Sequence, residues 1–245
     1  MNSLPKLSIL FLTCNRTEFA LLTLQSTMKN LLYPKDLVTF YIADDGSSPE
    51  HFKAVKECIE SNGFGIIGYH NKKIRHEGQE DTYNAGLGWN LGLGICHQNT
   101  DYVLVLEDDW NLDEPFEITP YINLLRENEK VGLCSFRILS VEADVHTVGY
   151  NSEIYLRYDS TTQYAYSGNP HIRHARYTKH YGWFAEDRNP GLVELHQDDL
   201  YRYREIEDGK MLLREENDGS PQIWRPYEIN QWGAWKHIGS EKTWK

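Results

Sequence analysis

Three consecutive carboxylates, Glu107-Asp108-Asp109, directly follow the run Tyr102-Val-Leu-Val-Leu106. Such a run of apolar and β-branched residues is typical of a strand buried on both faces. Open α/β sheets bind ligands at the carboxyl ends of their strands, so the acids would lie at a ligand-binding edge. Oxygen ligands there suit Mg²⁺ or Mn²⁺, and such an ion usually also holds a substrate phosphate. The alternative is an ordinary acidic loop after a core strand.

A second polar cluster, Asp44-Asp45-Gly46-Ser47-Ser48, follows another predicted strand. A carboxylate between a strand end and a helix N-terminus can accept hydrogen bonds from a base or a ribose. Thr13 and Arg16 follow the first predicted strand, and phosphoryl groups need a cation of this kind, or a divalent ion, opposite them. The three clusters together indicate a nucleotide site, although a tight turn with a capping serine would also explain the second one.

The elements that would position these side chains alternate between strands and helices. Apolar runs predict strands over residues 7–12, 37–43, 64–69, 102–106 and 131–138. Helical spacing predicts helices around 21–31, 49–62 and 83–97, and a further helix from Thr119. This order is the signature of a mainly parallel sheet with right-handed crossovers. The polar clusters after the first, second and fourth strands then share one edge of that sheet.

Four segments in this order resemble nucleotide-sugar glycosyltransferases of the GT-A fold, particularly the large family 2-like group. They cover about the first 140 residues and are Ser8–Arg16, Ile42–Ser48, Asn84–Gly92 and Val105–Asp109. The resemblance implies an α/β fold with a Rossmann-like, mainly parallel sheet flanked by helices. It implies a single domain over 1–245, with a nucleotide-sugar-binding half at 1–140 and an aromatic-rich acceptor-side half and tail at 141–245.

The resemblance also implies roles for individual residues. Glu107-Asp108-Asp109 takes the place of the family's DxD motif, with Glu first, as in certain N-acetylglucosaminyltransferases. Asp109 is then the metal ligand, for Mn²⁺ or Mg²⁺, with Glu107 and Asp108 nearer the ribose. The residues that bind the donor would be Thr13, Asn15, Arg16, Asp44, Asp45, Asn90, Glu107 and Asp108.

The helix that carries Asn90 has glycines at 86, 88, 92 and 94. They do not form a dinucleotide fingerprint, because the GxGxxG order and an immediately preceding strand are missing. Each glycine costs a helix about 1 kcal/mol relative to alanine. Close packing of this helix on the sheet is therefore the alternative to a contact with the donor.

The second half is rich in tyrosine and tryptophan, which suit stacking on sugars and equally suit a partly hydrated core. A basic stretch runs from His171 to His180. It is either a solvated loop or a channel for an anionic acceptor or the donor phosphates. The segment His171-Ile-Arg-His174 has no HExxH pattern around it, so zinc is not expected there.

Gly182–Asp187 and the acids that follow this segment resemble the acceptor-side region of the family. Transfer with inversion needs a carboxylate that takes the proton of the acceptor hydroxyl. The candidates are Glu194, Asp198 and Asp199, with Glu186 or Asp187 as the next choice. Glu194 and Asp198 are four residues apart and would share a helix face. Ordinary solvated acids are the alternative.

The tail from Gln231 to Trp244 contains three tryptophans and Ile238. Because chain ends fray unless they are tied down, this composition predicts a docked segment. The resemblance suggests that His237 is a second metal ligand or reaches the diphosphate, and that Lys242 lies nearby. The segment is predicted to be a lid over the donor or, alternatively, a hydrophobic strap.

Composition limits the class of protein. The 245 residues carry a net charge of −11, which argues against bulk attraction to nucleic acid or an anionic membrane. No apolar run is close in length to a membrane span, which needs about 20 residues. No signal peptide is expected before the first strand. A cytoplasmic protein is therefore predicted. The four cysteines form no CxxC pair, which favours reduced thiols over disulfides or zinc.

These observations predict a metal-dependent glycosyltransferase. It would move a sugar from a nucleotide diphosphate, most simply a UDP-sugar, to an acceptor hydroxyl by single displacement with inversion. The acceptor is not identified by the sequence and would be a glycan, a lipid-linked molecule, a protein or a nucleobase. A sugar-1-phosphate nucleotidyltransferase would need a glycine-rich loop after the first strand, and Thr13-Cys-Asn-Arg16 has no glycine. A non-catalytic glycan-binding module would leave the acidic and cationic clusters unexplained.

Overall fold

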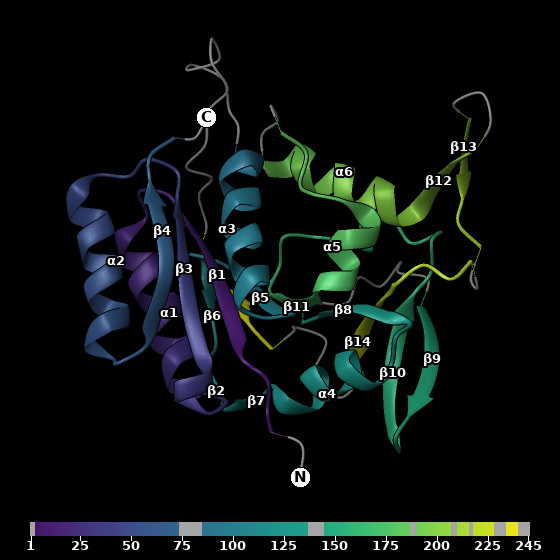
Figure 1. The fold of residues 1–245 in the computed structure, drawn as a ribbon, viewed down its shortest axis with the longest axis horizontal. Coiled ribbons are helices and arrows are strands. Elements are labelled where there is room, and N and C mark those ends of the chain that lie inside the picture. Colours follow the sequence, from purple (N-terminus) through teal and green to yellow (C-terminus); the bar gives the residue numbers. More distant parts are fainter. Residues whose placement is uncertain are drawn as a thin grey trace.

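The structure is a computed structural model that describes residues 3–73, 85–136, 145–186, 190–206, 210–215, 218–227 and 234–239. Its helices, shown in Figure 1, are α1 (Thr17–Asn30), α2 (Pro49–Ser61), α3 (Ala85–Asn99), α4 (Thr119–Glu127), α5 (Ala175–Tyr181), α6 (Pro190–Arg202) and the 3₁₀ turn η1 (Lys35–Leu37).

Nine strands form the main sheet: β1 (Leu7–Thr13), β3 (Val38–Asp44), β4 (Gly65–Asn71), β5 (Tyr102–Glu107), β8 (Val131–Ser135), β9 (Val145–Tyr150), β10 (Glu153–Tyr158), β11 (His171–His174) and β14 (Gln222–Pro226). Short two-stranded pairs are β2 (Leu31–Leu32) with β7 (Phe116–Glu117), β6 (Trp110–Asn111) with β15 (Lys236–His237), and β12 (Tyr203–Ile206) with β13 (Lys210–Leu213).

The order of the main sheet is β4-β3-β1-β5-β11-β8-β14-β10-β9. The first four strands are parallel, as the alternation of strands and helices predicts. β11 runs antiparallel to both β5 and β8, while β14 is parallel to β8. The α/β architecture is therefore confirmed, and the half of the sheet contributed by the later strands is mixed rather than parallel.

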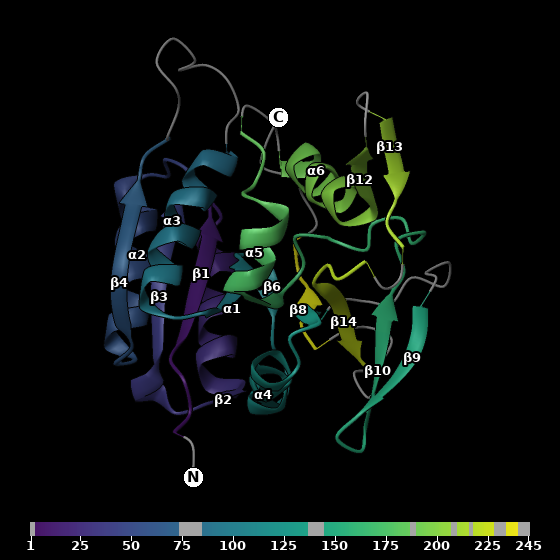
Figure 2. The ribbon, with the colours of Figure 1, turned by 45° about the vertical axis from the view of Figure 1, so that its right-hand side comes forward.

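Both faces of the parallel half are covered, which explains its nearly continuous apolar strands. On β1, Ile9 and Phe11 belong to a core with α1 and α2. The intervening Leu10 and Leu12 belong to a second core with α3. Figures 1 and 2 show α3 on one face of these strands and α1 and α2 on the other. Because side chains on both faces of these strands are packed, the strands are held in place and their carboxyl ends form one edge of the sheet.

The predicted boundaries agree with the structure to within a few residues. Ser48 caps α2 by accepting a hydrogen bond from the His51 amide at 3.2 Å. The strand predicted over 131–138 ends at Ser135 as β8, and Phe136 then donates its amide to Pro170 O. Part of this prediction lies outside the described residues, as do Asp187, Trp232, Lys242 and Trp244.

The first part of the basic stretch predicted as a loop or channel is instead a core strand, whereas Lys179 and His180 at its end are exposed. Residues 171–174 form β11 between β5 and β8, and α5 follows directly. His171 is 1% exposed and Arg173 is fully buried. The sequence did not predict this strand, because charged residues are not typical of a core strand. Its burial depends on the neighbouring strands β5 and β8.

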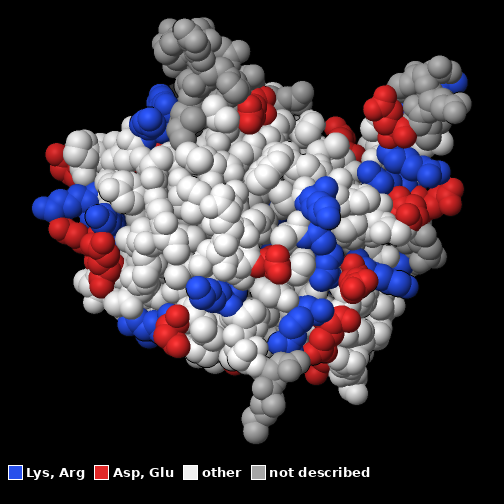
Figure 3. Space-filling view, viewed as in Figure 1, with Lys and Arg blue, Asp and Glu red and all other residues white. Residues whose placement is uncertain are grey.

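Two predictions from composition can be compared with the described residues. None of the helices there is both long and apolar enough to cross a membrane. Cys14, Cys58, Cys96 and Cys134 are all free thiols. Figure 3 shows a mixture of acidic and basic side chains around a largely uncharged centre on the face it displays.

Candidate donor and metal site

The three polar clusters predicted from the sequence meet at one edge of the sheet. Thr13 is in register with Asp44 at the ends of β1 and β3, and Leu12 is in register with Glu107 at the end of β5. The Asp45 amide also donates to Thr13 O at 3.1 Å. Parallel strands bring these positions together because their carboxyl ends lie on the same side.

Asp108 uses its carboxylate to hold the loop between β1 and α1. Its Oδ2 accepts from Thr13 Oγ1 at 2.8 Å and from the Cys14 amide at 3.1 Å, and its Oδ1 pairs with Arg16. The residue is 1% exposed. Burial raises its pKa to about 6, although Arg16 opposes the shift. Both oxygens of the Asp108 carboxylate thus have partners within the protein, and its contact with a ribose stays a prediction.

His51 supports this arrangement from α2. Its Nε2 and Nδ1 lie 2.9 Å from Thr13 Oγ1 and Thr17 Oγ1, respectively. Because Thr13 donates its only hydroxyl proton to Asp108, it must accept from His51 Nε2–H, and Nδ1 then accepts from Thr17. Burial lowers the pKa of His51, which favours this neutral form. The sequence offered no signal for His51, whose role depends on the contact between α2 and β1.

Asp109 is surrounded by cationic and polar donors. Its Oδ2 lies 2.6 Å from Arg16 Nη1 and 3.1 Å from His237 Nε2. Its backbone oxygen accepts from the Ile238 amide at 2.8 Å, next to the pairing of β15 with β6. Oδ1 is buried and has no hydrogen-bond partner among the described residues. The chain thus brings the two predicted metal ligands, Asp109 and His237, to one point.

The tail reaches Asp109 because Trp235 anchors it. Trp235 is fully buried, packs against Phe136 and Phe116, and places its Nε1 3.3 Å from Thr27 Oγ1. Ala234 donates its amide to Phe136 O at 3.1 Å. The predicted docking of the tail is therefore observed for residues 234–239. The anchor Trp235 lies two residues before His237, which contacts Asp109.

Asp44 is a carboxylate with an unused oxygen. It is fully buried, and its Oδ1 accepts from the Ser47 amide at 2.8 Å. Its Oδ2 is buried with no hydrogen-bond partner in the described parts of the chain, and burial raises its pKa. Asn15 joins the loop after β1 to the loop after β3. Its backbone amide donates to Ser47 Oγ, and its side-chain Oδ1 accepts from the Ser48 amide. Asp45 is partly exposed at the same edge.

Glu107 faces Glu194, an acid from α6. Oxygens of both side chains lie within 3.1 Å of the position that a Cβ on Gly168 would occupy. The Gly168 amide donates to Glu194 Oε1 at 2.9 Å. Burial, and then repulsion by Glu194, raises the pKa of Glu107 well above its usual value. Gly168, which sequence reasoning did not single out, leaves the room in which the two acids meet.

The other acids of α6 are placed differently. Asp198 is 2% exposed and accepts from the amides of Tyr164 and Tyr166 at 2.9 and 3.0 Å. Arg202 lies 3.8 Å from the same carboxylate. Asp199 is exposed to solvent. Of the three predicted candidates for the base, the structure brings Glu194 to the acidic end of β5 and uses Asp198 to hold a loop.

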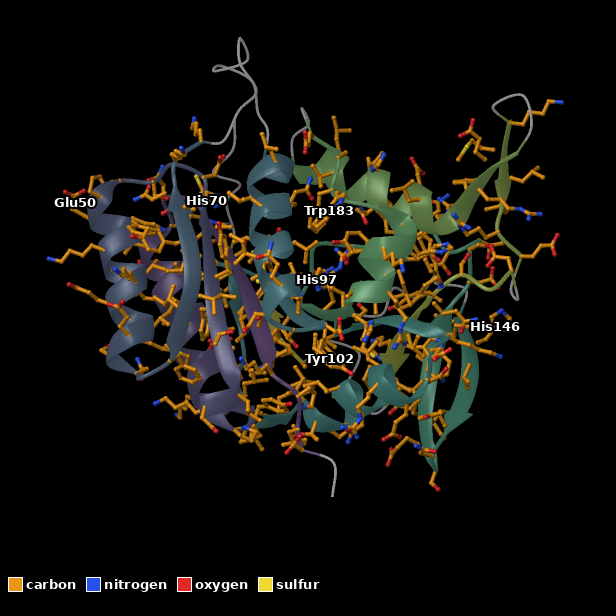
Figure 4. All side chains as sticks on the ribbon, in the orientation of Figure 1. Glu50, His70, His97, Tyr102, His146 and Trp183 are labelled. Carbon is orange, nitrogen blue, oxygen red and sulfur yellow. The ribbon has the colours of Figure 1, made fainter. Side chains whose placement is uncertain are left out.

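Asn90 contacts the segment between α5 and α6. Its Nδ2 donates to Phe184 O at 2.9 Å, and its Oδ1 accepts from the Phe184 amide at 2.8 Å. Glycines in the same helix allow close packing, since a Cβ on Gly92 would lie 2.6 Å from Leu10 Cδ1. Figure 4 shows Trp183 next to α3 and α6. Asn90 therefore joins α3 to the segment that leads into α6.

The donor set at Asp109 fits a hard divalent ion. The described residues contain no cluster of three or more His, Cys, Asp or Glu side chains that could enclose a metal. Asp109 Oδ1, which has no partner, and the nearby His237 ring nevertheless offer an oxygen and a nitrogen ligand. Mg²⁺ and Mn²⁺ commonly take few protein ligands and complete their shell with phosphate and water.

Solved structures share this architecture. TarS 1-349 from S. aureus in complex with UDP aligns with 91% of this chain at a TM-score of 0.60 and 14% identity. TarS 1-349 in complex with UDP-GlcNAc covers 97% at 0.54 and 15% identity. The mannosyltransferase PcManGT from Pyrobaculum calidifontis, in complex with GDP-Man and Mn²⁺, covers 89% at 0.53 and 13% identity.

This chain has the GT-A fold. It spans 58%, 61% and 56% of the lengths of those three solved chains. No protein-family model matches the sequence, and no curated protein matches it either. In this GT-A chain, the edge formed by β1, β3 and β5 carries the acidic, basic and histidine side chains described above.

Proposed function

We propose that the protein is a metal-dependent glycosyltransferase that moves a sugar from a nucleotide diphosphate to an acceptor hydroxyl. The observation that carries the proposal is the convergence of Asp109, His237 and Arg16 at the edge where Asp44 ends β3. The solved structures with the same fold were obtained with UDP, UDP-GlcNAc, or GDP-Man and Mn²⁺, which supports a nucleotide-sugar donor. We propose a UDP-sugar.

The nucleoside would lie beside β3. The unpartnered Oδ2 of Asp44 is suited to accept a hydrogen bond from a base. The diphosphate would lie near Arg16, at the N-terminus of α1, where Arg16 provides no side-chain cap for the first amides of the helix. Exposed amides and the helix dipole both favour a phosphate at such a position.

Asp109 and His237 would hold the divalent ion. When bound, the ion offsets negative charge on the leaving diphosphate. Arg16 contributes a further positive charge through its guanidinium, and the docked tail holds the backbone of Asp109 through the Ile238 amide. These residues orient the donor and stabilise the leaving group, while the proton transfer takes place at another carboxylate.

Glu194 would take the proton from the acceptor hydroxyl, and the transfer would invert the anomeric centre. The Gly168 amide orients its carboxylate toward Glu107. Two facing carboxylates repel each other when both are ionised, and burial together with this repulsion raises the pKa of Glu107. A general base placed in this way typically contributes about 10²–10⁴ in rate.

The test is a panel of UDP- and GDP-sugars incubated with Mn²⁺, Mg²⁺ or EDTA and scored by release of free UDP or GDP. We expect one nucleotide class to be turned over, slowly with water as acceptor, and only with a divalent ion. Asp109→Asn is the inactive control. Release of pyrophosphate from a nucleoside triphosphate and a sugar 1-phosphate would instead support a nucleotidyltransferase. Binding without release under every condition would contradict the proposal.

A further inference from the structure

Arg16 lies between the last two acids of the Glu107-Asp108-Asp109 segment. One guanidinium nitrogen pairs with Asp108 Oδ1 and the other lies 2.6 Å from Asp109 Oδ2. The Arg16 side chain is 18% exposed, while the two carboxylates are 1% and 9% exposed. In this partly desolvated place the ion pairs are stronger than surface pairs, because water screens them less.

A divalent ion at Asp109 would be a second cation on the same carboxylate. Oδ2 already receives Arg16 and His237, and Oδ1 alone has no hydrogen-bond partner among the residues described. An ion on Asp109 would therefore stand within a few ångströms of the guanidinium. Like charges at such a separation repel each other, and the double charge of the ion makes this repulsion twice that between two single charges.

Arg16 can leave Asp109 without stranding Asp108. Asp108 keeps its hydrogen bonds from the Thr13 hydroxyl and the Cys14 backbone amide, at the carboxyl end of β1. Arg16 Nε is buried and unpartnered within the described chain, so the guanidinium has donors to spare for another acceptor. A diphosphate beside the start of α1 would supply acceptors of that kind.

We propose that Arg16 is the counter-cation of the ligand-free site and competes with the divalent ion for Asp109. A bound nucleotide diphosphate draws the guanidinium away from Asp109 and so allows the ion to bind. Nucleotide and metal therefore bind cooperatively, and by linkage each strengthens the other by the same factor. This inference rests on the proposed function and concerns the order in which its donor site is filled.

The experiment measures Mn²⁺ binding by electron paramagnetic resonance and calorimetry, with and without UDP, so it does not depend on turnover. For the wild type we expect weak Mn²⁺ binding alone and binding about tenfold tighter with UDP. Arg16→Met should bind Mn²⁺ alone about tenfold more tightly than the wild type, and UDP should tighten Mn²⁺ binding by a smaller factor than in the wild type. Arg16→Lys keeps the charge without the bidentate geometry and should fall between them.

Arg126→Met is the matched control, because Arg126 pairs with Glu127 on α4 at the opposite end of the strands. It should leave Mn²⁺ affinity unchanged, and Asp109→Asn should abolish binding in every background. Should Arg16→Met fail to fold, Arg16→Lys carries the same comparison, and an affinity equal to that of the wild type would overturn the inference.

Two outcomes separate this inference from the proposed function. If the wild type binds Mn²⁺ and turns over a nucleotide sugar, but Arg16→Met binds Mn²⁺ no more tightly, only the competition is wrong. If no variant binds Mn²⁺ even with UDP, and turnover proceeds in EDTA, the metal dependence fails and the competition fails with it.

Discussion

Arg16 and Arg173 are both withdrawn from solvent, but their surroundings differ. Arg16 lies at the donor edge between two carboxylates. Arg173, on β11, is fully buried, and none of its three guanidinium nitrogens has a hydrogen-bond partner among the described residues. Its guanidinium instead lies over the rings of Tyr177 and Phe184, at 5.0 and 5.3 Å.

The difference indicates two uses of a buried cation. At the donor edge, charges of opposite sign meet in a place where a charged ligand can replace one partner. Among the described residues no carboxylate is paired with Arg173. Burial lowers the pKa of Arg173, and the cation–π contacts offset only part of the cost of burying its charge. Burial and the same arginine lower the pKa of His171 to about 3 and that of His97 to about 4. We infer that the first region exchanges partners and the second stays fixed.

The largest expected effect comes from removing a carboxylate at the exchanging region. Asp109→Ala should abolish metal-dependent binding of the donor, because it removes the only carboxylate that faces both Arg16 and His237 in the described structure. Calorimetry with UDP and Mn²⁺ measures this, and circular dichroism checks the fold. If Asp109→Ala keeps its affinity for UDP and the Mn²⁺ dependence of that affinity, Asp109 is not the carboxylate that a charged ligand uses, and the contrast with the surroundings of Arg173 fails.

The next effect separates Glu194 from Asp198. Glu194→Gln should lower the transfer rate by about 10²–10⁴ while leaving donor binding intact. Asp198→Asn should instead lower thermal stability, because it weakens the acceptor of two loop amides. Rates and melting temperatures of both variants decide the matter. A normal rate for Glu194→Gln together with a lost rate in stable Asp198→Asn would exchange the two roles, and Asp199→Asn would be measured beside them.

Trp235 tests whether the tail is a strap or a lid. Its full burial between aromatic rings predicts that Trp235→Ala costs about 3–5 kcal/mol of folding free energy, measured by urea unfolding. Donor binding should also weaken, since His237 follows two residues later. Limited proteolysis with and without UDP and Mn²⁺ distinguishes the readings. Protection of the tail only in the presence of ligand would favour a lid, whereas equal cleavage in both states would favour a strap.

The neutral histidine at β11 predicts loss of stability in acid. The pKa of His171 is about 3 when folded, against about 6.5 when unfolded, so the unfolded chain binds the extra proton first. Its contribution is complete above pH 6.5 and should fall by about 2 kcal/mol by pH 5. Urea unfolding at several pH values measures this slope. His171→Gln should flatten it, and an unaltered slope would show that His171 does not titrate in this way.

The smallest expected effect is also the sharpest contrast between the two regions. Arg173→Met should be neutral or should stabilise by about 1 kcal/mol, because it replaces a buried charge that lacks a counter-ion with an apolar side chain. For a chain of this size that raises the melting temperature by about 2–4 °C. Arg16→Met should lower it, since Asp108 loses its ion pair. A lower melting temperature for Arg173→Met would show that the contacts of Arg173 more than offset the cost of burying its charge.

Much of the donor edge could be predicted because strand-end positions can be found from local patterns. Thr13, Asp44 and Asp109 each follow an apolar run, and parallel strands then bring them together. Gly168 and His51 could not be predicted, because each acts through contacts with segments distant in the chain. Helical spacing alone left Glu194 and Asp198 equivalent, although Asp198 accepts the amides of Tyr164 and Tyr166 while Glu194 accepts that of Gly168 beside Glu107.

The sequence by itself determined the alternation of strands and helices, the side of the sheet on which the polar clusters lie, and the docking of an aromatic tail. These follow from periodicity and composition, which are local. Only the tertiary structure decided that the basic residues 171–174 form a central strand, that Arg16 bridges two acids, and that Asn90 joins α3 to Phe184. Burial and pairing depend on which segments become neighbours, and charge in the sequence does not record what will surround it.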